Sequence, residues 1–178
     1  GNKKNKTPRL DELAKQGTRF TSFYAQTVCG PSRSALLTGR YPIRSKGWGM
    51  PASEITFAEL MRESGYQTAC IGKWDVSNRK PITDRMPNAQ GFDYYFGMPV
   101  VNSAPPYVYV ENDRIVGSDP SDPLVHLGRN AKGTTPITPI PLEAAQRSPN
   151  QFGGAKKAHE LFNDYQVGTT LAKRPVDW

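Results

Sequence analysis

The 178-residue sequence has no long apolar run, and it contains only two cysteines and two histidines. No apolar segment approaches the roughly 20 residues that a membrane-spanning helix requires, and no signal-peptide pattern is present. Cys29 and Cys70 are too few for a disulfide framework. His126 and His159 stand alone without the spacing of metal ligands. We therefore expect no transmembrane segment, no disulfide-stapled fold, and a surface or packing role for each histidine.

The sequence carries more basic than acidic residues, 23 against 16, for a net charge of +7. This excess suits an anionic substrate or surface. The basic residues are scattered and do not alternate with aromatic residues on one face, which argues against nucleic-acid binding. The length is sufficient for one hydrophobic core. Because the chain starts at Gly1 and ends at Trp178 in what reads as an unfinished element, we expect part of a longer domain.

The most informative stretch is CGPSRSALLTGR, residues 29–40. Pro31 suits the first position of a helix and Gly39 is placed to end it, so Cys29 is predicted at the positive end of a short helix. Backbone N–H groups at that end favour an anion, Arg33 adds a positive charge, and the hydroxyls of Ser32 and Ser34 can donate hydrogen bonds. This stretch therefore predicts a site for an oxyanion ester.

The residues alone leave the state of Cys29 open. It can be an unmodified cysteine at a helix start, it can pair with Cys70 in a disulfide, or it can act as a thiolate, since a helix N-terminus lowers the pKa of a thiol. Cys70 lies in the apolar run 68–71, where a small buried thiol is the expected interpretation.

The pattern Cys-x-Pro-Ser-Arg, followed by Leu-Thr-Gly-Arg at residues 37–40, resembles the signature of the type I sulfatases. Their fold belongs to the alkaline phosphatase superfamily. The resemblance implies that Cys29 is oxidised to formylglycine, an aldehyde that hydrates to a geminal diol. One hydroxyl of the diol attacks the sulfur of a sulfate ester, and deprotonation of the other expels sulfate. Arg33 would stabilise this group, and formylglycine 29 would be one ligand of Ca²⁺.

The chain before and after this signature indicates alternating helices and strands. Residues 7–17 are predicted as a helix, with Thr7 as its cap, Pro8 in its first turn, Gly17 at its end and one buried apolar stripe. Residues 18–25 are predicted as a strand that leads to Cys29.

A second helix is predicted after Thr56, which can form a capping box with Glu59. Gly65 should end it, and the apolar run 66–74 is typical of a buried strand in a parallel sheet. The chain thus contains two successive units in which a helix is followed by a strand, and this order predicts an α/β fold.

This second strand leads to Gly72-Lys73-Trp74-Asp75, which is similar to the Gly-Lys-Trp-His motif of the sulfatases. The resemblance implies that Lys73 contacts the sulfate, whereas Asp75 stands where most relatives have histidine. Asp75 is a candidate substrate-binding residue, and it can equally be a carboxylate neutralised by Lys73 or Arg79. A solvated strand-end lysine remains the alternative for Lys73.

Further elements are expected downstream. Residues 91–97 resemble the aromatic Gly-Phe-Asp segment of the family and should serve packing, and residues 107–110 and 114–116 indicate a small hairpin. The stretch 118–151 is rich in proline, glycine, serine and threonine and is predicted as a long surface excursion. Residues 155–165 have helical spacing, and another helix should begin near Thr169 and end or kink at Pro175.

Together these features identify residues 1–178 as the N-terminal part of one sulfatase catalytic domain. The resemblance implies an α/β domain with a mostly parallel central sheet flanked by helices, its first and later strands missing. It also implies cleavage of sulfate monoesters of carbohydrate or small molecules, a formylglycine-generating maturation enzyme as partner, and a periplasmic or secreted location.

The aspartate pair and the Asp-Asn pair that complete the family's calcium site have no match in this chain, so no useful turnover is expected from these residues alone. Two alternatives remain: a phosphonate or phosphate monoester hydrolase of the same fold, or a non-catalytic binder of sulfated ligands.

Overall fold

The computed structural model describes residues 4–44, 50–76, 86–99, 108–116, 125–127, 156–158 and 166–178. Their helices are α1 Pro8–Gln16, α2 Cys29–Thr38, α3 Phe57–Glu63, the 3₁₀ turn η2 Pro87–Gln90, and α5 Val167–Asp177. Their strands are β1 Ala69–Lys73, β2 Tyr94–Met98, β3 Val110–Glu111, β4 Arg114–Ile115, β5 Val125–Leu127 and β6 Lys156–Ala158. Within these ranges no helix is long and apolar enough to cross a membrane.

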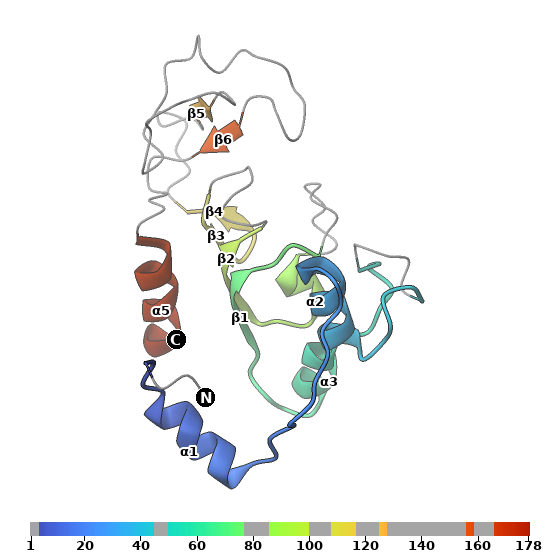
Figure 1. Cartoon of the computed structure of the whole chain (residues 1–178). Coiled ribbons are helices and arrows are strands. Elements are labelled where there is room, and N and C mark those ends of the chain that lie inside the picture. The colour runs from blue at the N-terminus through green and yellow to red at the C-terminus, as the bar shows by residue number, and fades with distance from the viewer. Residues whose placement is uncertain are drawn as a thin grey trace.

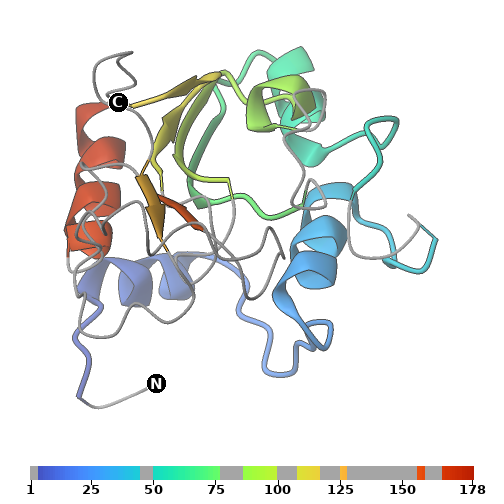
Figure 2. The same cartoon turned by 90° about the horizontal axis from the view of Figure 1, so that it is seen from above.

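A four-stranded sheet in the order β1-β2-β3-β4 forms the centre of the fold. β1 and β2 are parallel, with Ala69 opposite Tyr94 and Lys73 opposite Met98, whereas β3 and β4 add antiparallel pairs. Helix α5 lies on one side of the sheet, and α2 and α3 lie on the other (Figure 1). The view from above shows the same separation (Figure 2). The expected α/β fold with flanking helices is confirmed.

The hydrophobic core lies between the sheet and the α2–α3 side. Trp74 and Tyr95 are fully buried, and Phe92 packs edge-on against Trp74 with ring centroids 6.0 Å apart. The aromatic residues of segment 91–97 therefore serve packing, as expected. On the opposite side, the Arg174 guanidinium of α5 lies 4.1 Å from the centroid of the Phe96 ring. Both sides of β2 are thus covered, which holds the β1–β2 pair in place.

The capping box at the start of α3 is confirmed. The Thr56 hydroxyl accepts a hydrogen bond from the Glu59 N–H at 3.2 Å, and the Glu59 carboxylate accepts one from the Thr56 N–H at 2.7 Å. Gly65 follows the helix with a φ of 85°, and Gly39 ends α2 with a φ of 67°. Both glycines occupy the left-handed region that terminates helices, so these two ends were predicted correctly.

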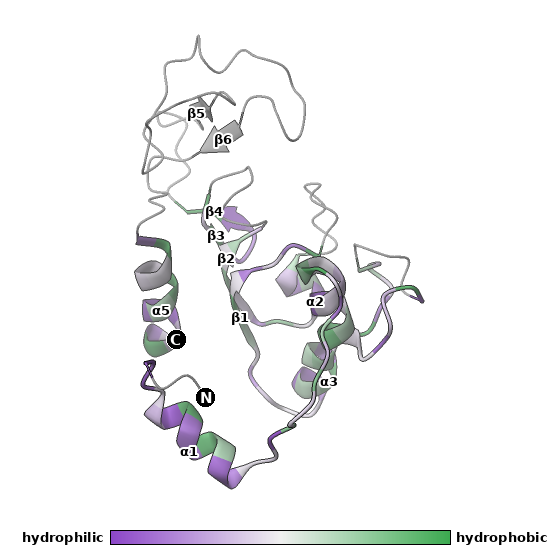
Figure 3. Cartoon of the chain, in the orientation of Figure 1, coloured by the Kyte–Doolittle hydropathy of each residue, from purple (hydrophilic) through white to green (hydrophobic). Residues whose placement is uncertain are grey.

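Helix α1 has the predicted bounds but neither the predicted cap nor the buried stripe. The Thr7 hydroxyl donates to the Asp11 carboxylate at 3.2 Å and makes no cap hydrogen bond. Leu10 and Leu13 are about two-thirds exposed, at 65% and 64%. Apolar and polar residues share its surface (Figure 3). The described part of the chain offers no cover for this apolar stripe.

Segment 18–25 is not the predicted strand, because it has no strand partner among the described residues. An alternating sequence does not form a stable strand unless a neighbouring strand pairs with its backbone groups. Phe20, Phe23 and Tyr24 are all exposed. The segment nevertheless leads to Cys29, as the sequence indicated.

Two predictions near the C-terminus need correction. Residues 156–158 form β6, paired with β5 over 125–127, where helical spacing predicted a helix over 155–165; the pairing joins distant residues that local spacing does not reveal. α5 continues through Pro175 to Asp177, so the predicted end at Pro175 is wrong, while the alternative, a kink there, stays a prediction. The predicted hairpin is confirmed with the shorter strands β3 and β4. Apart from β5, the excursion 118–151 lies outside the described residues.

Candidate functional site

The candidate site lies where the start of α2 meets the carboxyl end of β1. Cys29 is the first residue of α2, Lys73 is the last residue of β1, and Asp75 follows two positions later. The carboxyl ends of parallel strands are where α/β sheets commonly bind ligands. The fold therefore brings together Cys29, Arg33, Lys73 and Asp75, the four residues that the sequence singled out.

Helix α2 begins two residues earlier than predicted, so Pro31 is its third residue and not its first. Cys29 remains in the first turn and is exposed. The Ser32 hydroxyl donates to the Val28 carbonyl at 2.8 Å, and Ser34 is fully buried. The Ser32 hydroxyl is therefore bonded to the backbone, and the Ser34 hydroxyl lies inside the protein. Pro31 has no N–H and the Ser32 N–H donates to the Val28 carbonyl at 3.2 Å, which leaves the N–H groups of Cys29 and Gly30 as donors at the start of α2.

Arg33 joins α2 to the end of β1. Its Nε donates to the Trp74 carbonyl at 2.8 Å, and its Nη2 donates to the Lys73 carbonyl. Because Trp74 is fully buried, its carbonyl depends on a protein donor. Arg33 thus positions the helix start beside Lys73 and Asp75.

Lys73 and Asp75 form an ion pair beside Cys29. The Lys73 Nζ lies 3.1 Å from Asp75 Oδ2, and the Asp75 side chain has no exposed surface, whereas that of Lys73 is 21% exposed. The Cys29 Sγ lies 3.9 Å from the same carboxylate oxygen. The alternative in which Lys73 neutralises Asp75 is therefore realised, and both groups adjoin Cys29. Arg79 lies outside the described residues.

The surroundings lower the pKa of the Cys29 thiol, because the Lys73 ammonium donates a hydrogen bond to the thiolate and adds its positive charge. Burial and the negative charge of Asp75 act in the opposite direction. By contrast, burial raises the pKa of Cys70 to about 11. Both cysteines are free thiols, so the disulfide alternative is not realised here.

Sequence reasoning missed the close approach of Gly72 and Gly97, which face each other across β1 and β2. A Cβ added to Gly97 would lie 1.8 Å from the Gly72 carbonyl oxygen, far inside contact distance. A glycine in the interior of a strand often marks such an approach, so the Gly-Met end of β2 carried a usable signal. Any larger residue at 97 would displace the end of β1 and with it Lys73.

The described residues do not by themselves provide a calcium site. Calcium binds about six to eight oxygen ligands. No group of three or more His, Cys, Asp or Glu residues gathers in the described ranges. The Asp75 oxygen nearest Cys29 is already paired with Lys73. Ligands for this ion would have to include groups beyond those described.

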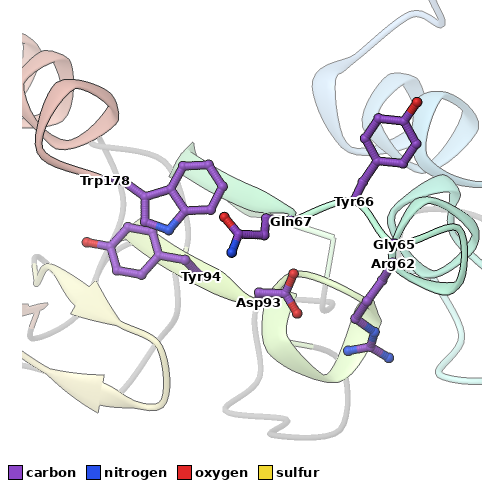
Figure 4. Close-up of a pocket in the computed structure, with 7 residues that line it drawn as sticks. All are labelled: Arg62, Gly65, Tyr66, Gln67, Asp93, Tyr94 and Trp178. Carbon is purple, nitrogen blue, oxygen red and sulfur yellow. The ribbon is translucent and has the colours of Figure 1, made fainter.

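A hollow of about 510 Å³ lies at the ends of β1 and β2 that are opposite to the Cys29 site (Figure 4). Residues on its wall include Arg62, Gln67 and Asp93. The Trp178 indole stacks on the Tyr94 ring there, with centroids 6.3 Å apart. This hollow is separate from the Cys29 site, and it contains none of the residues singled out from the sequence.

Replacing Arg33 with lysine is expected to lower the free energy of unfolding by about 1–3 kcal/mol, because one ammonium group cannot replace two directed donors to buried carbonyls. Urea unfolding of the variant measures this loss. Arg9→Lys, on exposed α1, is the matched control and should change little. Equal stability of the Arg33→Lys variant and the parent would contradict this role.

Comparisons with known proteins agree with the family that the sequence signature indicated. The family model described as Sulfatase matches residues 1–123. The chain is 37% identical over 168 residues to an N-acetylgalactosamine-6-O-sulfatase of Bacteroides thetaiotaomicron, covering 85% of this chain and 33% of that protein. It is 42% identical over 118 residues to mouse arylsulfatase G, covering 58% of this chain and 22% of that protein.

A solved structure from work on the metabolism of multiple glycosaminoglycans by Bacteroides thetaiotaomicron superposes with a TM-score of 0.70 at 27% identity. It covers 96% of this chain and 42% of that structure. The chain thus spans about a third of the first of these curated relatives and about a fifth of the second. The match of the family model over more than half of the sequence shows that this chain belongs to the sulfatase family.

Proposed function

We propose that the protein carrying this chain hydrolyses sulfate monoesters of carbohydrate, with Cys29 in its formylglycine form as the nucleophile. One observation carries this proposal: Cys29 is exposed at the start of α2, beside the Lys73–Asp75 pair at the end of β1. An N-acetylgalactosamine-6-O-sulfatase among the relatives supports a sulfated sugar as substrate.

Each residue of the site has a task in this proposal. Formylglycine supplies a hydrated aldehyde, one hydroxyl of which would attack the ester sulfur and displace the alcohol. Loss of the proton of the other hydroxyl would then expel sulfate and restore the aldehyde. Lys73 binds a sulfate oxygen and stabilises the negative charge that grows on it in the transition state, and the N–H groups at the start of α2 act in the same way. Arg33 holds the nucleophile in register with Lys73 through its two carbonyl contacts and adds positive charge nearby. Asp75 orients Lys73 toward the substrate.

Calcium is proposed as the accompanying cation, with formylglycine 29 as one ligand and the others from beyond the described residues. A hard cation with oxygen ligands would neutralise the sulfate. The maturation enzyme that oxidises Cys29 is the proposed partner, and a periplasmic or secreted location is proposed with it.

Residues 1–178 alone are expected to show no useful turnover with calcium present, and robust hydrolysis by them would contradict that expectation.

Peptide mass spectrometry across Cys29 tests the proposal, after co-expression of the protein carrying this chain with a formylglycine-generating enzyme. We expect the mass of formylglycine at residue 29, together with calcium-dependent hydrolysis of a sulfated N-acetylgalactosamine. A thiol that persists at Cys29, with binding of sulfated ligands but no hydrolysis, would favour the non-catalytic binder. Faster cleavage of phosphate or phosphonate monoesters than of matched sulfates would favour the other enzyme class.

A further inference from the structure

We propose that Asp75 is a charge selector, which makes the site prefer singly charged sulfate esters to doubly charged phosphate esters. This inference rests on the proposed function and adds a specificity-determining role to one residue. It starts from an observation that ordinary oxyanion binding does not explain, namely a carboxylate 3.9 Å from the nucleophile position.

The carboxylate is held rigidly in this place. The Asp75 side chain is fully buried, its Oδ2 is paired with Lys73, and its N–H donates to the Pro99 carbonyl at 3.0 Å. The backbone of Asp75 has a φ of 49°, in the left-handed region that aspartate, asparagine and glycine tolerate best. The Asp75 carboxylate therefore keeps its position when an anionic substrate binds beside it.

The positively charged side chains of Arg33 and Lys73 already interact with other groups of the protein before any substrate binds. Arg33 is directed at two backbone carbonyls, and the charge of Lys73 is offset by Asp75. A sulfate monoester brings one negative charge, whereas a phosphate monoester brings two above its second pKa of about 6. The second charge is additionally repelled by the Asp75 carboxylate. At a separation of a few ångströms near a protein surface, this repulsion corresponds to an at least about tenfold preference for the sulfate ester over the phosphate ester.

Replacing Asp75 with asparagine tests the role, because it removes the charge, keeps the shape and suits the positive φ. We expect the ratio of kcat/KM for p-nitrophenyl sulfate to that for p-nitrophenyl phosphate to fall by at least about tenfold at pH 8. p-Nitrophenyl methylphosphonate has phosphorus but one negative charge, so its rate should change in step with the sulfate. Asp113→Asn, which removes an exposed charge in the β3–β4 turn, should leave all ratios unchanged.

A purely structural role of Asp75 would alter the three rates together and leave their ratios constant, which would overturn the proposal. A gain for the methylphosphonate equal to that for the phosphate would also overturn it, because it would point to phosphorus and not to charge. If Asp75→Asn unfolds, Asp75→Gly provides the same removal of charge at a φ that glycine accepts.

Ligand binding provides a readout that needs no turnover. In the protein with unmodified Cys29, calorimetry should show that Asp75→Asn tightens binding of p-nitrophenyl phosphate at least about tenfold relative to p-nitrophenyl sulfate. An unchanged ratio of dissociation constants would overturn the charge selector. Failure of the proposed function is distinguishable, since it would show as a parent protein that contains formylglycine and cleaves no sulfate ester.

Discussion

Replacing Cys29 with alanine is expected to lower sulfate ester hydrolysis by at least about 10⁴-fold, the order of loss seen when an enzyme loses its covalent nucleophile. Alanine cannot be oxidised to an aldehyde, so neither the attacking hydroxyl nor the group that expels sulfate can form. Hydrolysis of p-nitrophenyl sulfate by the protein carrying this chain, co-expressed with the maturation enzyme, measures the effect. The fold should survive, because Cys29 is exposed.

Cys70→Ala is the matched control for this variant. Cys70 lies within β1 and is partly buried, and the two cysteines are not bonded to each other. Its replacement should leave hydrolysis nearly unchanged and lower stability slightly through the lost packing. A Cys29→Ala protein that keeps a substantial share of the parental rate would exclude Cys29 as the nucleophile's precursor.

Replacing Lys73 with methionine is expected to lower kcat/KM for sulfate esters by about 10²–10³-fold, the order of loss reported for a donor aimed at transition-state charge. Methionine keeps much of the volume but removes the cation, and it leaves the buried Asp75 carboxylate without this partner. The substrate would then meet the negative charge of Asp75 without the ammonium group of Lys73.

The same variant has a second consequence in the protein with unmodified Cys29. Lys73 lowers the pKa of the Cys29 thiol in the parent, so its removal should raise that pKa. The rate of iodoacetamide alkylation should therefore reach half its maximum at a higher pH, because the thiolate is the reactive form. Lys15→Met, on exposed α1, is the matched control. Identical alkylation profiles for the parent and Lys73→Met would contradict the contact between Lys73 and Cys29.

The sequence by itself determined the features that depend on neighbouring residues. The end of α2 at Gly39, and the capping box of Thr56 and Glu59, follow from interactions within a few positions of the chain. The signature around Cys29 also indicated the family, because its residues lie close together in the sequence. These predictions needed no knowledge of the sheet.

Only the tertiary structure decided how the site is assembled. Arg33 reaches the carbonyls of Lys73 and Trp74, 40 and 41 positions away, and the Cys29–Asp75 contact spans 46. These contacts depend on the parallel register of β1 and β2 and on the close approach at Gly97. The exposed stripe of α1 likewise depends on what packs against it. Contacts between distant residues are set by how the elements pack, and a local sequence pattern does not contain that information.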